Sequence, residues 1–455
     1  MYISGIATGL DTETLVQQLM AIERRPLVLM QERKNLLQQQ RDAWRDINTR
    51  LNNLRDRMAE LSRTSLFEGR SAVSSAADVA TASATRDAAE ARYNIEVVQL
   101  AQSHRVASAK REGAIGYTGF AWLAVGDQEW DQEQEWVKIE IGATDTVHTI
   151  AEKINEADVA VTARVIDGRL VIQADETGEA HQLKFEGALW RELGITGDDG
   201  EILDTAQLQS AQDAVFKIEG LTIARSSNKI DDVIEGVTFT LQGEGETVID
   251  IKRDEAAVLD AVRKFVEQYN STMSFIQSRS SDGGVLQGDT LLMRIAFQLR
   301  SDITARVGGA GLAYNQLAAV GISIDRHGTM TLNEAKLREA LADDPEAVQK
   351  LFAATQDPDG FDGVTARLES RFQAWLQAGD GLLAARQKMF GDRMKAIDDS
   401  IEQMERRLEI REQNLMRQFI ALEEVMAAFQ TQAMWLEGQI NQLNLMTAAS
   451  AQRRR

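Results

Sequence analysis

Cysteine is absent from this chain of 455 residues, and features of several protein classes are missing with it. Without cysteine there is no disulfide framework, no thiolate nucleophile and no cysteine-bound zinc. No apolar run approaches the roughly 20 residues that cross a bilayer, so we expect no membrane insertion. Residues Met1–Asp11 have neither a basic head nor an uninterrupted apolar stretch, so we expect no cleaved secretory signal.

An excess of basic residues is also missing. Asp and Glu number 70 and Lys and Arg number 50, which gives a formal net charge of −20. A chain of this charge is repelled by polyanions. Nucleic acid and anionic membrane surfaces are therefore not expected as main partners.

Motifs that carry catalysis or bind metals are scarce. The histidines show no ligand spacing, which argues against zinc. Asp357–Gly363 has the acidic spacing of a calcium loop but lacks its terminal glutamate, so a turn is the preferred interpretation. Gly308–Gly311 is not followed by the Lys of a phosphate loop, and no pair of carboxylates stands out for glycosidase chemistry. We expect no enzyme, no metal and no cofactor. The histidines are His104, His148, His181 and His327.

What the sequence does contain is a long heptad pattern near its C-terminus. From Leu382 to Met446 apolar residues recur at alternating steps of four and three, with charged and amide residues between them. An extra step of four after Leu415 is a stutter, which locally unwinds a supercoil. The predicted helix would be roughly 95 Å long, too long for one compact domain to bury, so it needs a partner helix. The pattern comprises Phe390, Met394, Ile397, Ile401, Met404 and Leu408, then Leu415, Phe419, Leu422, Met426, Phe429, Leu436, Ile440 and Leu443.

A second amphipathic stretch near the N-terminus supplies that partner. Asp11 or Thr12 can cap a first short helix, and Pro26 suits the first turn of the next. Packing within one chain, with no functional partner, is a strong interpretation for Leu51–Leu61. That interpretation is weaker for Leu15–Ile22 and Phe429–Leu443, at the two ends of the sequence, because no other domain is available to bury them. The first helix carries Leu15, Leu19 and Ile22, and the second contributes Trp44, Ile47, Leu51, Leu54, Met58 and Leu61 to a predicted coiled-coil stem.

Between the helical ends the apolar period changes from 3.6 to 2, which predicts antiparallel sheet. Phe67–Ala91 is rich in small residues and is interpreted as linker or extended chain. Gly113–Trp136, with an acidic run and three tryptophans, is interpreted as an exposed loop. We predict strands at Tyr93–Leu100, Val137–Ile141, Val159–Ile166, Leu170–Ala174, Ala214–Ile218, Val237–Leu241 and Val248–Lys252, with a short helix at Thr149–Asn155.

Helical patterns return at Asp254. They predict helices at Leu291–Arg306 and Leu332–Phe352 and a hairpin at Ile322–Thr331. The fold class is therefore α+β and multidomain, with a long antiparallel coiled-coil stem from both termini and an inserted antiparallel β-rich head. The expected domains are an N-terminal arm (1–65), an inner head (66–118 and 208–253), an outer head (119–207), a helical stem (254–380) and a C-terminal helix (381–455).

Short motifs along the chain resemble those of the bacterial flagellar filament cap family, also called flagellar hook-associated protein 2. The resemblance spans essentially the whole chain, and the ordered set is specific although each piece alone is weak. The motifs are Gly5–Thr12, Leu19–Leu27, Tyr93–Ala101, Ile154-Asn155, Val159–Ala163, Gly178, Ala211–Ala214, Ser227-Asn228, Ile234–Thr238, Phe265–Asn270, Leu286–Asp289 and Val320–Ile322. The acidic tryptophan-containing loop matches no part of the family pattern.

The resemblance implies an extracellular, non-enzymatic assembly protein at the flagellum tip, exported by the flagellar apparatus without a cleaved signal. Its expected partners are other copies in a ring, flagellin, hook–filament junction proteins and an export chaperone. The terminal apolar residues named above, Leu15 to Ile22 and Leu415 to Leu443, are expected to contact the filament or neighbouring copies. The alternatives are an adhesin whose head binds glycans through Trp122, Trp130 and Trp136, and a hydrolase in the head.

Overall fold

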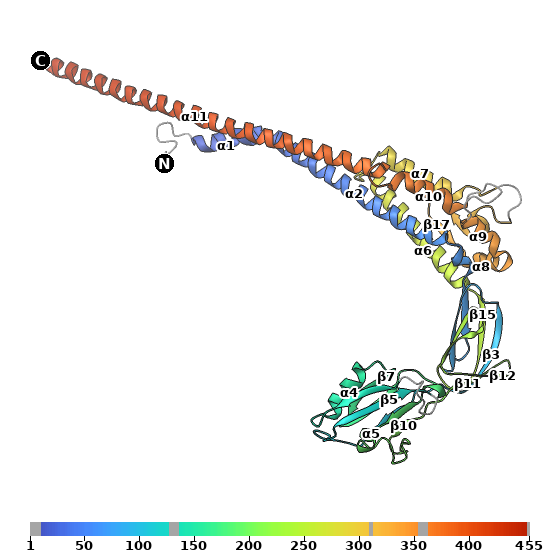
Figure 1. Ribbon diagram of the computed structural model, residues 1–455. Coiled ribbons are helices and arrows are strands. Elements are labelled where there is room, and N and C mark those ends of the chain that lie inside the picture. Colours follow the sequence, from blue (N-terminus) through green and yellow to red (C-terminus); the bar gives the residue numbers. More distant parts are fainter. Residues whose placement is uncertain (1–10, 127–135, 309–312, 354–362, 453–455) are drawn as a thin grey trace. The chain divides into compact units, whose positions relative to one another are not determined.

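The computed structural model describes residues 11–126, 136–308, 313–353 and 363–452 (Figure 1). The chain divides into two compact units. A helical unit consists of Met1–Ser62 and Leu259–Arg455, and a β-rich unit consists of Arg63–Val258. The helical unit is thus built from both ends of the sequence, and the β-rich unit is an insertion. The predicted α+β multidomain fold is confirmed.

The helical unit begins with α1 (Thr12–Glu23) and α2 (Arg25–Leu61). The Asp11 carboxylate caps α1 by accepting hydrogen bonds from the hydroxyl and the backbone N–H of Thr14. These two bonds stabilise the ionised carboxylate and lower the pKa of Asp11. Pro26 lies in the first turn of α2, where its missing N–H costs no hydrogen bond. Both helix starts agree with the sequence prediction.

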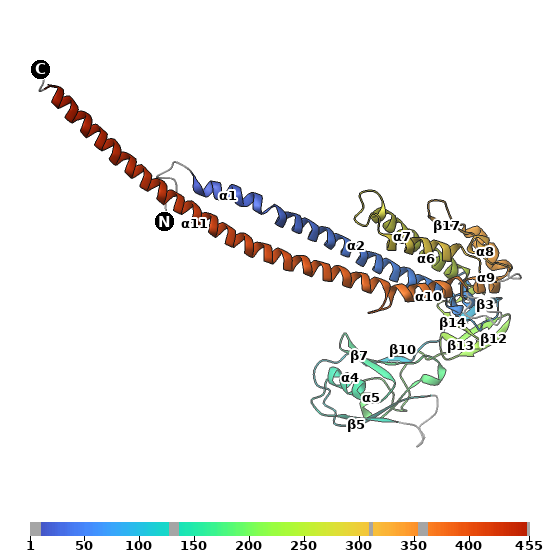
Figure 2. The ribbon, with the colours of Figure 1, turned by 90° about the horizontal axis from the view of Figure 1, so that it is seen from above.

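The longest element is α11 (Leu382–Gln452), which at 1.5 Å per residue is about 105 Å long. It begins at the predicted residue and continues past the predicted end at Met446. Its direction is opposite to that of α1 and α2. The Arg24 guanidinium lies 3.3 Å from Glu412, and the Lys34 ammonium lies 2.5 Å from Asp398, so residue numbers rise along one helix as they fall along the other (Figure 2). The predicted antiparallel pairing of the two termini is confirmed.

The remaining helices of this unit pack around α2 and α11. Helix α10 contacts α2, α7, α9 and α11, and no sequence pattern indicated it. The single helix predicted at Leu332–Phe352 is wrong, because Pro345 lacks an N–H and starts a new helix after Asp343. These elements are α6 (Glu255–Ser280), α7 (Thr290–Thr304), η2 (Leu317–Val320), β16 (Ile322–Ile324), β17 (Met330–Leu332), α8 (Glu334–Asp343), α9 (Pro345–Ala353) and α10 (Val364–Leu376).

Two antiparallel sheets form one part of the β-rich unit. The first has the strand order β1-β15-β3-β11-β12 and the second β13-β14-β2. They share a core in which Phe216, Phe239, Ile249 and Ile251 are buried. The elements are α3 (Thr64–Glu68), β1 (Arg70–Ser74), β2 (Ala80–Ala84), β3 (Ala91–Gln99), β11 (Ala214–Ile218), β12 (Leu221–Arg225), β13 (Lys229–Ile234), β14 (Val237–Leu241) and β15 (Gly245–Arg253).

The segment between β3 and β11 forms the other part, with its own core. It contains sheets of order β10-β4-β8-β7 and β6-β5-β9, and helix α4 packs on β7. Phe185 and Trp190 lie at the centre of this core, with ring centroids 4.8 Å apart. The elements are β4 (Arg105–Ala107), β5 (Gly119–Val125), β6 (Val137–Ile141), α4 (Val147–Glu156), β7 (Val161–Ile166), β8 (Arg169–Ala174), η1 (Glu179–His181), β9 (Leu183–Glu186), α5 (Ala188–Glu192) and β10 (Gln207–Gln209).

Two interpretations of the insertion are wrong. The segment Phe67–Ala91 is not a linker, because it contains β1 and β2, which pair with β15 and β14. Gly113–Trp136 is not a loop throughout, because it contains β5, the central strand of its sheet, with Ala121 and Leu123 fully buried. In both segments strands from elsewhere in the sequence supply the pairing.

Candidate interaction surface of the terminal helices

Helix α1 is held on α11 by a small apolar cluster. Val16 and Met20 of α1 are buried against Leu408 and Leu415 of α11. These residues recur at helical spacing, so each helix presents a continuous apolar edge to the other. Leu27, Met404 and Phe419 are partly buried around the cluster. The apolar contact between α1 and α11 thus extends along α11 to the level of Phe419.

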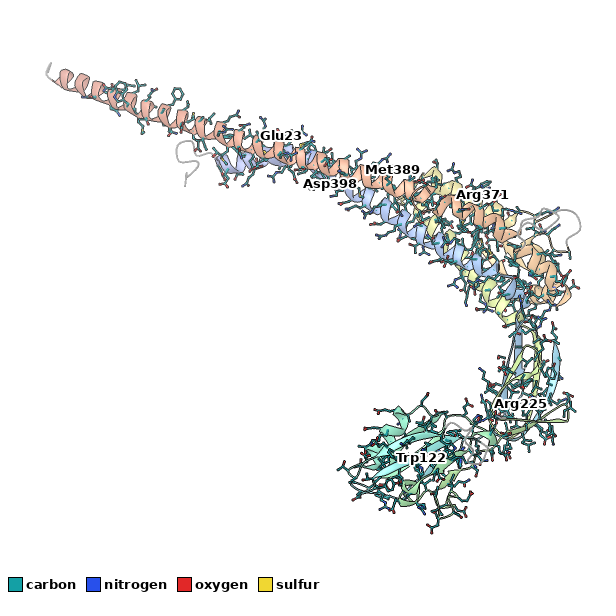
Figure 3. All side chains as sticks on the ribbon, viewed as in Figure 1. Glu23, Trp122, Arg225, Arg371, Met389 and Asp398 are labelled. Carbon is teal, nitrogen blue, oxygen red and sulfur yellow. The ribbon has the colours of Figure 1, made fainter. Side chains whose placement is uncertain are left out.

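Polar contacts along the same contact line fix the register of the two helices. The Thr12 hydroxyl donates to a Glu423 carboxylate oxygen at 3.4 Å, and Arg411 lies 3.6 Å from Glu23, which is labelled in Figure 3. Both Arg411 and Glu23 are about half exposed, so this ion pair is worth less than about 1 kcal/mol. The apolar cluster rather than these pairs holds the helices together.

From Leu422 to Ile440 the large apolar side chains of α11 are exposed. Figures 1 and 2 show α11 continuing alone past the start of α1 at Thr12. Phe429 is 60% exposed and Trp435 is 64% exposed. Exposed apolar surface of this extent marks an interaction site. We define the terminal apolar face as Leu422, Val425, Met426, Phe429, Met434, Trp435, Leu436 and Ile440.

Charge is depleted over the same part of α11. Charged residues occur in every turn from Arg386 to Arg417, but between Arg417 and Gln452 only Glu423, Glu424 and Glu437 are charged. Amide and small residues occupy the other polar positions. Depletion of charge around exposed apolar residues is typical of the core of a protein interface. The terminal half of α11 therefore has the composition of a surface that becomes buried on assembly.

The predicted contact residues fall into three groups. Leu415 is buried and Phe419 and Leu15 are half-buried within the chain, whereas Leu19 and Ile22 are exposed. The predicted residues of the terminal half are all exposed, except that the side chain of Leu443 lies outside the described part. Sequence reasoning missed exposed residues that lie off the heptad seam. They include Val425, Met434 and Trp435 on α11 and Val28, Leu29 and Leu36 on α2.

The predicted stem residues lie in the other half of the helix pair. Helix α2 packs there against α11 and α10. On α11, Phe390 and Leu408 are buried and the four residues between them are half-buried: Met394, Ile397, Ile401 and Met404. On α2, all six predicted residues are buried: Trp44, Ile47, Leu51, Leu54, Met58 and Leu61.

Arg386 is a cation inside this stem. Its guanidinium lies 5.5 Å from the ring centre of Trp44 and 5.3 Å from that of Phe390, distances at which a cation is attracted to an aromatic face. The same group is paired with Asp289, whose carboxylate also caps α7 through the N–H groups of Leu291 and Leu292. One ion pair thus joins the start of α7 to α11.

Two of the three tryptophans of the predicted head tip lie in the described ranges, and both are half-buried. Trp122 lies in β5, half-buried, and its carbonyl accepts a hydrogen bond from the indole of Trp190 at 3.0 Å. Trp136 is also half-buried and lines a pocket of about 360 Å³ with His104 and other residues. Trp130 lies outside the described residues.

The described part of the chain offers neither a metal site nor a membrane-spanning helix. In the described ranges no three His, Asp or Glu side chains come together where they could hold a metal ion. The possible calcium turn at Asp357–Gly363 lies outside those ranges, apart from Gly363. None of the described helices has both the length and the apolar character to span a bilayer.

Family models match at both ends of the chain. The model described as the flagellar hook-associated protein 2 N-terminus matches residues 8–104, and the model described as its C-terminus matches residues 211–431. A-type flagellar hook-associated protein 2 of Pseudomonas aeruginosa is 28% identical over 459 residues, which cover 93% of this chain and 94% of that protein. Flagellar hook-associated protein 2 of Halalkalibacterium halodurans is 23% identical over 94% of this chain and 97% of that protein.

A solved structure is similar to most of the chain. The crystal structure of domains D1-D2-D3 of the flagellar cap protein FliD from Escherichia coli superimposes with a TM-score of 0.58 and 25% sequence identity. The superposition covers 76% of this chain and 99% of that chain. The similarity therefore extends through both the helical and the β-rich architecture.

Proposed function

Because the chain belongs to the flagellar hook-associated protein 2 family, we propose that it forms the cap at the distal end of the bacterial flagellar filament. There it promotes the folding and polymerisation of flagellin at the growing tip and prevents the loss of flagellin monomers. The observation that carries the proposal is the terminal apolar face of α11, which has no partner among the described residues of the chain.

In this proposal the terminal half of α11 is a leg that docks on the apolar inner helices of the filament. Burying a side chain such as Phe429 or Leu436 contributes about 1.5–3 kcal/mol. Association also costs several kcal/mol of lost freedom, so a single leg binds weakly. Several legs on one assembly bind together with high avidity and can still release one at a time, which a cap requires as each flagellin subunit is added.

The remaining parts of the proposal concern partners and location. The protein acts as a homo-oligomeric ring outside the cell, after export through the flagellar channel with a chaperone, and contacts the hook–filament junction proteins before flagellin arrives. Its role is structural, and we assign no reaction to it. The adhesin alternative gains no support from Trp122 and Trp136, which are half-buried.

Deletion of the chain from its organism tests the proposal. We expect cells that carry hooks without filaments and monomeric flagellin in the culture medium, measured by immunoblotting beside electron micrographs. Reintroducing the full chain restores filaments and clears the medium. Normal filaments on the deletion strain would show that the chain does not cap them.

A further inference from the structure

The pair formed by α1–α2 and α11 carries a second apolar stripe besides the buried one. It recurs at heptad spacing, with Pro26 and Arg33 at the two non-apolar positions. Leu15 and Leu19 come one position before Val16 and Met20, which pack on α11, and Leu36 comes one position before the buried Leu37. Its members beyond Leu15 are 41–64% exposed. We define this outer stripe as Leu15, Leu19, Ile22, Leu29 and Leu36.

A complementary surface lies on α11. A shallow hollow of about 580 Å³ is lined by residues of one helix face. Glu409 and Met416 come one position after the buried Leu408 and Leu415, and the other lining residues lie on the same helix face. We define this acidic hollow as Glu409, Glu412, Gln413, Met416 and Arg417.

The two surfaces face opposite sides of the helix pair. One residue corresponds to about 100° of rotation around a helix. The outer stripe precedes its buried edge by one residue, and the acidic hollow follows its buried edge by one residue. Because α11 runs antiparallel to α1 and α2, these two displacements correspond to rotations of the same sense when the helix pair is viewed along its length. The buried edges point toward each other, so this rotation directs the outer stripe to one side and the acidic hollow to the other.

The charges beside the two surfaces are complementary. Arg25 and Arg33 flank the outer stripe, and Glu405 and Glu409 lie on the face of the acidic hollow. None of these four residues makes an ion pair within the described ranges. The Arg24–Glu412 and Lys34–Asp398 pairs set the register. By that register Arg25 is level with Glu409.

The same register aligns the apolar members. Leu19 of the outer stripe is level with Met416 of the acidic hollow, and Leu15 is level with Ile420, which is half-buried. A closed ring has no rise between neighbours, so residues at the same level meet when the helix pairs stand parallel to the ring axis. Apolar residues then face apolar residues, and Arg25 faces Glu409.

We propose that the outer stripe of one copy docks on the acidic hollow of the next copy. Two different, oppositely directed surfaces make a heterologous interface, which generates a ring when its rotation closes. The partner is a second copy of this chain. The inference rests on the proposed function for the closed ring, and it identifies the outer stripe and the acidic hollow as one place where neighbouring copies meet.

Engineered cysteines test the contact without interference, because the chain has none of its own. Leu19→Cys and Met416→Cys are combined in one chain, which replaces the natural chain in filament-bearing cells. After mild oxidation, non-reducing gel electrophoresis is expected to show a ladder of covalent multimers. Leu19→Cys with Gln418→Cys is the matched control, because Gln418 is exposed on the other side of α11 at nearly the same level. That pair and each single cysteine are expected to stay monomeric.

The outcomes separate the interface from the function. Normal filaments without a ladder would overturn the interface and leave the capping role intact. A ladder in cells whose filaments grow equally well without the chain would uphold the interface and overturn capping. Covalent dimers from a single-cysteine variant would indicate a symmetric contact and contradict the heterologous one.

Charge exchange gives a second readout if the cysteine variant fails to support filaments. Arg25→Glu with Arg33→Glu is expected to lower the fraction of assembled chain in sedimentation of the purified protein. Adding Glu405→Arg and Glu409→Arg is expected to restore it, because the pairing is re-formed with reversed signs. Failure of the four-fold variant to recover assembly would overturn the proposed interface.

Discussion

At the scale of single residues, Asp289 contributes to the helical unit in two ways. Its carboxylate accepts the first free N–H groups of α7 and also neutralises Arg386, which is packed beside Trp44 and Phe390. The side chain of Asp289 is only 8% exposed. Removing it leaves a guanidinium beside aromatic rings with no counter-charge and leaves a helix start without its cap.

We therefore expect Asp289→Ala to lower the free energy of unfolding of the helical unit by about 3 kcal/mol. Urea denaturation followed by circular dichroism measures the change. Asp42→Ala is the matched control, because the Asp42–Arg41 pair is exposed and worth less than about 1 kcal/mol. Equal effects of the two substitutions would contradict the role assigned to the Asp289–Arg386 pair.

His104 is a buried titratable residue in the β-rich unit. Its Nδ1 accepts the backbone N–H of Leu183 at 2.9 Å, so in the neutral ring the proton is on Nε2. Burial, and to a lesser degree the charge of Lys184, lowers the pKa of His104. Protonation of Nδ1 would place two donors against each other and break the bond to Leu183.

The stability of the β-rich unit should therefore depend on pH. Because the folded pKa of His104 lies below the unfolded value of about 6.5, the unfolded chain binds more protons as the pH falls through that value. The contribution of His104 to the free energy of unfolding is fully present above about pH 6.5. It is lost as the pH falls below that value, by at most about 1.4 kcal/mol per pH unit. Urea midpoints measured from neutral to mildly acidic pH should fall less steeply in His104→Gln than in the parent.

His148→Gln is the control for this pH dependence. It removes a histidine that is exposed at the start of α4, whereas His104 is buried in the same unit. If His104→Gln keeps the parent's slope of stability against pH, the acid sensitivity must come from other groups.

At the scale of elements, sequence reasoning succeeded where a local period determines the structure. The heptad pattern located α11, and strict alternation located β6, β11 and β14 at their observed bounds. The strands β1 and β2 are built largely of Ala, Ser and Thr, which give no amphipathic signal. They are strands because β15 and β14, more than 150 residues away in the sequence, pair with them.

The candidate surface was predictable to a similar degree. The seam residues Leu422, Met426, Phe429, Leu436 and Ile440 are indicated by the heptad spacing and are exposed. The spacing does not predict how far along α11 the contact with α1 extends, because that depends on the register of two segments almost 400 residues apart in the sequence. It also does not mark Trp435, which lies off the seam.

The part of α11 beyond Glu424 should contribute nothing to the stability of the isolated chain. Deleting residues 425–455 is expected to remove helical signal and leave the urea midpoint of the helical unit unchanged, because no core residue is lost. Deleting residues 405–455 also removes Leu408 and Leu415, which cover Val16 and Met20, so the midpoint should fall. A lower midpoint after the shorter deletion would mean that the terminal half packs on its own chain.

At the scale of the whole molecule, the topology separates two tasks. Both ends of the sequence build the helical unit, and the β-rich unit is inserted between them. The terminal helices can therefore form contacts of their own while the insertion keeps separate cores. The insertion was predictable because the apolar period changes twice along the chain, from helical to alternating and back.

The central claim is that the terminal apolar face of α11 holds the cap on the filament. The most direct test introduces Phe429→Asp and Leu436→Asp together into a strain that lacks the natural chain. Gln432→Asp with Gln439→Asp adds the same two charges at exposed polar positions of the same helix and is the matched control. The measurement is the share of flagellin found in the medium rather than in filaments. We predict that most flagellin is in the medium for the first variant and in filaments for the control. Filaments of normal length and a clear medium with the first variant would contradict the account.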